Sequence, residues 1–226
     1  MNDDSFRRSP ISTGRSKKSD KRARILDAAV EVFAQRGFFH ARVSDVAHAA
    51  GVAGGTIYLY FKNKDDLLIN LFEDRMEAIL VLLRAELATL DSASARLRRM
   101  LDLHLSMVSA QPALAEVFTV EVRQSAKFMR EYTPQKFMEY LGLLEQILEE
   151  GCASGEFRPG LDPKVLKLVL FGALDEVSLF WIRSRRDGLQ PPYDLKRAAD
   201  EIWALCTASL VRDTAVTTAS DRQQRS

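Results

Sequence analysis

The chain has 226 residues, a formal net charge of +1 and a hydrophobic content of 46%. This length accommodates one large helical domain or a small domain joined to a bigger one, and the hydrophobic content is that of a globular protein. Charge is unevenly distributed: residues 1–64 hold 12 Lys and Arg against 6 Asp and Glu, whereas residues 65–226 hold 20 against 25. The front therefore carries +6 and the rear −5, so we expect only the front to face a polyanion such as DNA.

The cysteines and the most apolar stretch indicate the cellular compartment of the protein and whether the chain spans a membrane. Cys152 and Cys206 are distant in sequence and form no Cys-x-x-Cys motif, which is typical of reduced thiols in a cytoplasmic protein. The first 24 residues lack the apolar core of a secretory signal. Residues 165–182 are apolar but interrupted by one basic and two acidic residues, so they predict a buried helix rather than a membrane span.

The N-terminal residues 1–20 are polar, which predicts a disordered tail. Basic residues gather where this tail meets the first helix, namely Arg15, Lys17, Lys18, Lys21, Arg22 and Arg24. The cluster either keeps the tail soluble or contacts phosphates or the minor groove of DNA. A first helix is predicted from Lys21 to Gly37, because apolar residues between them follow one helical stripe.

Residues 43–64 predict two short helices joined by a sharp turn. Ser44 is expected to cap the first of them, with Asp45 near its positive end. Gly51 is expected to adopt a positive φ at the turn, and Gly54 or Gly55 to open the next helix. Such a pair of helices places the second one in the major groove of DNA.

The second helix of this motif has the chemistry of a DNA reader. Its two leading glycines let the backbone approach base edges, and Thr56 suits a phosphate or a thymine methyl. Tyr58 and Tyr60 would lie about 200° apart around a helix axis and donate their hydroxyls to phosphates on opposite sides of the groove. Lys64 adds charge at the N-terminus of the following helix. The alternative is that Tyr58, Tyr60 and Phe61 are core aromatics of an ordinary helical hairpin.

Six further helices are predicted behind the motif, and no alternating strand pattern or internal repeat occurs. Gly151 is expected to end one of them, and Asp162 with Pro163 to open the next. Their ranges are about 64–90, 95–109, 113–130, 135–150, 163–185 and 194–211. The predicted fold class is all-α, a three-helix helix-turn-helix DNA-binding head on a six-helix ligand-binding and dimerisation body. The domains are a tail at 1–20, the head at 21–66, the body at 67–212 and a disordered tail at 213–226.

The helix predicted at 163–185 is apolar nearly all round, so it must be covered on two sides. One side is expected to face the core and the other a partner subunit, with the last helix supplying the rest of the interface. This pattern favours an obligate homodimer. The candidate dimerisation residues are Phe171, Leu174, Val177, Trp181, Ile202, Trp203 and Cys206.

Residues 51–68, GVAGGTIYLYFKNKDDLL, resemble the signature of TetR-family transcriptional repressors, and the match covers about residues 21–68. The resemblance implies a homodimer joined by the last two helices. It also implies that a ligand in the body moves the two heads apart and releases a palindromic operator. The base-facing positions of the family correspond to Gly54, Gly55, Thr56, Tyr58 and Leu59. The phosphate contacts correspond to Ser44, Tyr60 and Lys64, and Arg42 is a further candidate DNA contact.

Four body segments, at 121–125, 142–144, 150–156 and 171–176, resemble a narrower group of the same family. These are the FadR-like regulators of fatty-acid degradation, which sense long-chain acyl-CoA. The resemblance extends over most of residues 21–185 and departs in the first 20 residues and at 191–194. It implies an acyl-CoA effector and no cofactor.

Apolar residues on the predicted stripes of the body suit an acyl chain, because Met adapts its shape to a flexible ligand. The candidates are Phe72, Met76, Leu101, Leu105, Val108, Phe118, Val122, Phe137, Tyr140, Leu141 and Leu144. The alternative for each of them is simple core packing.

Polar residues inside apolar helices are the second set of ligand candidates. Arg123 would pair with a phosphate and Gln124 with an amide or thioester carbonyl; the alternative is a surface Arg paired with a Glu. Asp175 and Glu176 either pair across the dimer or hold Arg123. His104, among leucines, is expected to be a satisfied core histidine.

The predicted function is that of a dimeric repressor of fatty-acid metabolism genes, released from its operator by long-chain acyl-CoA. One alternative is a TetR-like repressor of an efflux or other operon that responds to a different hydrophobic molecule. Another is a sequence-nonspecific DNA-binding protein. An enzyme is excluded, because His40, His48 and His104 have no metal-ligand spacing and no HExxH, GxSxG or P-loop motif occurs.

Overall fold

The computed structural model describes residues 17–211, and in this range it contains helices and no β-strand, which confirms the all-α fold class. The elements are α1 (Lys17–Arg36), α2 (Val43–Ala49), α3 (Gly54–Ile57), α4 (Lys64–Leu87), α5 (Ala93–Ala110), α6 (Pro112–Thr119), the 3-10 helix η2 (Glu121–Gln124), α7 (Ala126–Arg130), α8 (Gln135–Ser154), α9 (Pro163–Arg186) and α10 (Leu195–Leu210). Among them, none is long and apolar enough to cross a membrane.

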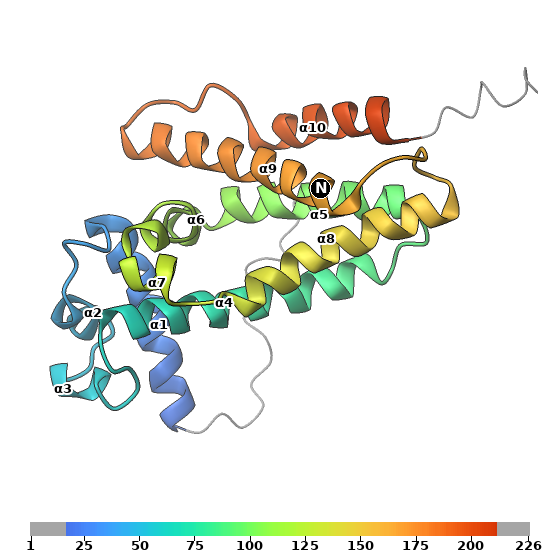
Figure 1. The fold of residues 1–226 in the computed structure, drawn as a ribbon. Helices are drawn as coiled ribbons and strands as arrows, with labels where there is room; N and C mark the ends of the chain where they lie inside the picture. The colour runs from blue at the N-terminus through green and yellow to red at the C-terminus, as the bar shows by residue number, and fades with distance from the viewer. Residues whose placement is uncertain (1–16, 212–226) are drawn as a thin grey trace, which may run out of the picture.

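Helices α1, α2 and α3 gather at one end of the molecule, and α4 runs from this head into a body of long helices (Figure 1). Helices α6 and α7 lie at the end of the body nearest the head, and α6 packs against α1. One continuous set of buried apolar side chains extends from Ile25 in the head to Leu210 in the body. The two parts are therefore joined by close-packed side chains rather than by a flexible linker.

Several helix starts occur where the sequence places them. Asn63 caps α4 by accepting the N–H of Asp66 at 2.8 Å. Asp162 caps α9, with Pro163 in the first helical position. Both caps confirm the predicted starts, because a side-chain oxygen satisfies an N–H that has no partner within the helix.

Other boundaries were predicted wrongly. Helix α1 begins at Lys17, inside the predicted tail, whereas residues 1–16 and the tail predicted at 213–226 lie outside the described residues. Helix α8 continues through Gly151 and ends at Ser154, with Gly155 in the left-handed region at φ 77°. Gly151 has a packing role instead, since a Cβ there would lie 2.2 Å from the ring of Phe157.

The single helix predicted at 113–130 is three elements, α6, η2 and α7. The break is stabilised by Ser125, whose extended backbone lets its hydroxyl accept the N–H of Phe128 and cap α7. Ser and Thr favour such caps over helix interiors. This break lies between the head and a cavity in the body.

Candidate functional site

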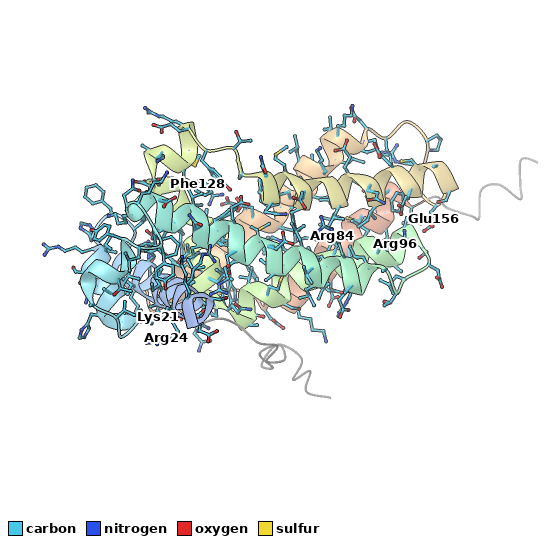
Figure 2. The ribbon with its side chains drawn as sticks, turned by 90° about the horizontal axis from the view of Figure 1, so that it is seen from below. Lys21, Arg24, Arg84, Arg96, Phe128 and Glu156 are labelled. Atoms are coloured by element: carbon cyan, nitrogen blue, oxygen red, sulfur yellow. The ribbon has the colours of Figure 1, made fainter. Side chains whose placement is uncertain are left out.

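The turn of the helix-turn-helix motif has the predicted geometry. Gly51 has a φ of 62°, the left-handed conformation expected of a glycine at this position. Arg24 of α1 donates to the carbonyl of Ala50 at 2.6 Å and thereby fixes the turn against the first helix. Figure 2 shows Arg24 and Lys21 near one another on α1. A Cβ on Gly51 would lie 3.2 Å from the Arg24 guanidinium.

The basic cluster at the start of α1 is divided between structural and exposed residues. Arg22 pairs with Asp74 at 2.9 Å, and Arg24 fixes the turn. Lys18 and Lys21 are exposed. Arg15 and the side chain of Lys17 lie outside what the structure describes, and a DNA contact by the cluster stays a prediction.

The N-terminus of α2 corrects one prediction. Arg42, not Ser44, is the N-cap, and its N–H is accepted by Asp45 at 2.9 Å. This hydrogen bond, together with the guanidinium of Arg36 at 2.9 Å, holds the pKa of Asp45 below its usual value. Ser44 and the Arg42 side chain are exposed on the surface of the motif, which leaves them available to a phosphate.

Helix α3 begins at Gly54 and ends at Ile57, which anchors it in the core. Tyr58 and Leu59 follow in a turn and are 60% and 76% exposed. Tyr60 also lies in this turn, half-buried against the core. The predicted 200° arrangement of Tyr58 and Tyr60 is therefore wrong, because it required a continuous helix.

The start of α3 is open to an approaching duplex. Gly54 and Gly55 are exposed, and a Cβ on either would meet nothing within 4 Å. The open space therefore lies on the outside, where base edges would approach. Thr56 is half-buried beside them.

Lys64 has a different role from the predicted phosphate contact. Its ammonium donates to the carbonyls of Phe38, Phe39 and Ala41 at 2.7, 3.1 and 3.0 Å. An ammonium has three N–H donors, so all of them are used within the head. The structure therefore assigns Lys64 to fixing the segment between α1 and α2 against α4.

A cavity of about 400 Å³ lies in the body, between α4, α5, α6, η2, α7, α8 and α9. Its wall is mostly apolar and rich in aromatic rings. Phe128 of α7, labelled in Figure 2, packs edge-on against Phe72 with ring centroids 5.0 Å apart. Eight of the predicted ligand residues line it: Phe72, Met76, Val108, Phe118, Val122, Arg123, Phe137 and Tyr140.

Five predicted ligand residues do not line the cavity. Gln124 is exposed elsewhere, and the others are packed in the solid core. These four are Leu101, Leu105, Leu141 and Leu144. A stripe of apolar residues marks the side of a helix that faces inward, but it does not separate a cavity wall from a packed interior.

The lining of the cavity ends, on the side away from the head, within the packed body. Ile79, His104, Tyr140 and Phe171 are the farthest lining residues on their helices. Beyond them, leucines such as Leu83 are fully buried and do not line the cavity. Of these four lining residues, only Tyr140 was predicted as a ligand residue; His104 was assigned to the core and Phe171 to the dimer, and Ile79 was not among the candidates.

His104 and Tyr140 form a hydrogen-bonded pair in this end wall, with 2.8 Å between Nδ1 and the hydroxyl. Burial lowers the pKa of His104 to about 4, so the ring is neutral near pH 7. Burial likewise raises the pKa of the Tyr140 hydroxyl, which therefore keeps its proton. His104 is satisfied at Nδ1 as predicted, but it also faces the cavity.

Arg123 and Asp175 form an ion pair in the cavity wall, at 2.7 Å between Nη2 and Oδ2. Of the two alternatives for Asp175, the structure shows that it holds Arg123. The Arg123 side chain is 43% exposed, and a guanidinium has five N–H donors. Further donors are therefore available to an anion beside the cavity. Glu176 is exposed.

Most of the predicted dimerisation residues are packed inside the subunit, which corrects the predicted interface for them, whereas Val177 and Trp203 keep part of their surface exposed. Leu174, Trp181, Ile202 and Cys206 are buried within the subunit, Phe171 lines the cavity, and Val177 and Trp203 are half-buried against the core. Helices α9 and α10 pack together along one side of the body (Figure 1). Their outward apolar residues, each more than half exposed, are Val165, Leu168, Val169, Phe180 and Leu205. A helix that is apolar all round has no periodicity from which the outer face could be chosen.

Comparison with protein families gives two matches that together span most of the chain. Residues 25–71 match the bacterial regulatory proteins of the tetR family, and residues 72–209 match the C-terminal region of YsiA-like proteins, a TetR C-terminal family. The boundary lies within α4, where the head joins the body.

Individual relatives agree with these matches. The fatty acid metabolism regulator protein of Bacillus subtilis is 35% identical over 193 residues, 85% of this chain and 97% of its own. The crystal structure of FadR from B. subtilis in complex with stearoyl-CoA is 36% identical, with a TM-score of 0.75 over 81% of this chain and 96% of that one. The fatty acid degradation regulator FadR from Bacillus halodurans gives 35% identity and a TM-score of 0.76 over 85% and 96%. From its fold, its helix-turn-helix head and these matches, this chain belongs to the TetR family of bacterial transcriptional regulators.

Proposed function

We propose that this protein is a dimeric repressor of fatty-acid metabolism genes whose hold on a palindromic operator is released by a long-chain acyl-CoA. The observation that carries the proposal is the apolar cavity with the Arg123 guanidinium in its wall. An acyl chain fits the first feature and a phosphate of coenzyme A the second. A similar protein, FadR of B. subtilis, has been solved with stearoyl-CoA bound.

The cavity dimensions fit only part of such a ligand. About 400 Å³ lies near the lower end of the usual range for small-molecule sites, about 300–1,000 Å³. It encloses a hydrocarbon chain and leaves the nucleotide outside. In this arrangement the chain ends against His104, Tyr140 and Phe171, and the charged part of coenzyme A lies toward Arg123.

A dimer is required for a palindromic operator, because two identical heads read two identical half-sites. The exposed apolar residues of α9 and α10 are the surface we propose for it. Substituting Glu for Leu168 would place a charge there, and we expect the molar mass measured by light scattering to fall to that of a monomer. A dimer of unchanged mass would exclude this surface.

An effector with polar atoms along its length is a second candidate. The Tyr132 hydroxyl lines the cavity region, is buried and has no hydrogen-bond partner in the part of the chain that the structure describes. A buried hydroxyl without a partner is costly, and an alkyl chain cannot supply one. This observation favours a repressor of another operon that responds to a more polar hydrophobic ligand.

Native mass spectrometry of the purified protein separates the two candidates. We expect stearoyl-CoA to bind one molecule per subunit and coenzyme A alone to bind far more weakly, because it lacks the buried chain. If stearoyl-CoA does not bind and an unrelated compound co-purifies, the acyl-CoA proposal fails and the second candidate stands.

A further inference from the structure

The 3-10 helix η2 lies between the cavity and the DNA-binding head, and side chains of this region point in both directions. Val122 and Arg123 line the cavity, whereas Glu121 contacts the head. Successive residues serve two sites because a 3-10 turn separates neighbouring side chains by about 120° around its axis. An occupied cavity and a positioned head therefore act on the same four residues.

Glu121 reaches from the body into the head. Its side chain is 2% exposed, and its Oε2 accepts the N–H of Phe38 at 2.5 Å. Gly37, with φ 74°, lies directly against this carboxylate, since a Cβ there would be 3.5 Å from Oε2. A hydrogen bond to a carboxylate is stronger than one between neutral groups, and its loss would leave a buried amide without a partner. The position of residues 37–38 therefore depends on Glu121.

Ser125 provides a second contact between this segment and the head. Its hydroxyl donates to Oδ1 of Asp65 at 2.6 Å. Asp65 follows Lys64, whose ammonium holds the carbonyls of the segment between α1 and α2. The segment at residues 38–41 is thus fixed from two sides. Glu121 of η2 accepts the amide N–H of Phe38, and Lys64 of α4 donates to backbone carbonyls of the segment.

On the cavity side, the same turn is held by the ion pair of Arg123 with Asp175 on α9. A ligand that takes a donor of Arg123, or that presses on Val122, acts directly on η2. One 3-10 turn has poorer hydrogen-bond geometry than an α-helix, and such turns inside helical segments often mark hinges. We therefore expect η2 to change conformation more readily than the long helices around it. A displacement of η2 changes the position of residues 37–38, from which α2 and α3 are presented to DNA.

We propose that Glu121 is a positioning residue for DNA binding, which transmits occupancy of the cavity to the helix-turn-helix motif through the amide of Phe38. Ser125 is the second link in the same path. The inference rests on the proposed function, since it requires a ligand whose binding weakens the hold on DNA. It assigns the path of that signal to residues that touch neither the DNA nor the ligand.

Three variants test this path: Glu121→Ala, Ser125→Ala and the conservative Glu121→Gln, whose amide oxygen still accepts an N–H. Glu131→Gln is the matched control, because Glu131 is exposed at the end of α7. The readout is the ratio of operator Kd values with and without saturating stearoyl-CoA, using a duplex selected from a random library by the full-length protein. The affinity for stearoyl-CoA in the absence of DNA is measured alongside.

When two sites in one protein are coupled, binding at one site usually changes the Kd at the other by a factor of about 5–150. We expect Glu121→Ala and Ser125→Ala to lower this ratio at least about threefold, with stearoyl-CoA affinity changed by less than about twofold. Glu121→Gln is expected to keep most of the ratio and Glu131→Gln all of it. If Glu121 and Ser125 only stabilised the fold, their loss would lower the affinities for operator and for stearoyl-CoA without changing the ratio of operator Kd values.

The outcomes separate the two proposals. If stearoyl-CoA leaves the operator affinity of the unaltered protein unchanged, the proposed function fails. If the unaltered protein responds and both alanine variants respond with the same ratio, the role of Glu121 is overturned. Should Glu121→Ala fail to fold in a thermal melt, Ser125→Ala decides by the same ratio. Hydrogen exchange gives a readout without DNA: stearoyl-CoA should speed exchange of the amides at 38–41, and an unchanged rate contradicts the path.

Discussion

Replacing Arg123 by Ala should weaken stearoyl-CoA binding. A hydrogen bond to a charged group contributes about 1.5–3 kcal/mol. The Arg123 side chain is 43% exposed, so water screens part of this interaction and the lower end of the range applies. A loss of about 1.5 kcal/mol corresponds to a rise in Kd of roughly tenfold.

Asp175→Asn is the matched control, because it removes the carboxylate that competes for the same guanidinium. An exposed ion pair contributes up to about 1 kcal/mol, so this variant should bind stearoyl-CoA about two- to fivefold more tightly. Isothermal titration calorimetry at low and high salt measures both variants. The unaltered protein should lose affinity as salt rises, and Arg123→Ala should lose less. Equal Kd values and equal salt dependence for the unaltered protein and Arg123→Ala would remove Arg123 from the ligand site.

Three further predictions concern the head, the cavity and stability. Thr56→Ala should change which operator bases the protein prefers, whereas Tyr58→Phe should weaken binding to all sequences alike. Selection of duplexes from a random library by each variant measures the difference. Equal losses of affinity on every sequence for both variants would contradict this prediction. Phe171→Ala should raise the longest acyl chain that binds, while Met107→Ala, nearer the head in the same wall, should not; calorimetry with acyl-CoAs of increasing length checks this. The pKa of His104 is about 4 in the folded state and 6.5 in the unfolded state. Between these pH values the unfolded state binds more protons than the folded state. The free energy of unfolding therefore falls as pH falls through this window, by about 1.4 kcal/mol per pH unit. Urea unfolding at pH 7 and pH 5 should show a smaller loss for His104→Gln than for the unaltered protein, and equal losses would refute the assignment.

The sequence predicted the features that local chemistry determines. Gly51 adopts a positive φ, α4 begins at Lys64 and Asp162 caps α9, because each depends on residues next to it in the chain. The all-α class followed in the same way from helical periodicity. Turns and helix caps of this kind can be predicted without knowing the rest of the fold, because adjacent residues determine them.

Features that depend on distant residues were harder to predict. The contact of η2 with the head joins Glu121 to the Phe38 amide, 83 residues away in the chain. Lys64 was expected at a phosphate because its three carbonyl partners are not visible as partners in the sequence. Likewise, an apolar stripe did not reveal that Leu101 packs solidly while His104, one turn away, faces a cavity.

The central claim is that an acyl-CoA in the cavity of the body controls DNA binding by the head. The most direct test is a titration of stearoyl-CoA into the purified full-length protein bound to a fluorescent operator duplex, followed by fluorescence anisotropy. We predict that anisotropy falls to that of free DNA as stearoyl-CoA occupies one site per subunit, and that coenzyme A alone has no effect at the same concentration. Stearoyl-CoA that binds the protein and leaves the anisotropy unchanged would contradict this account.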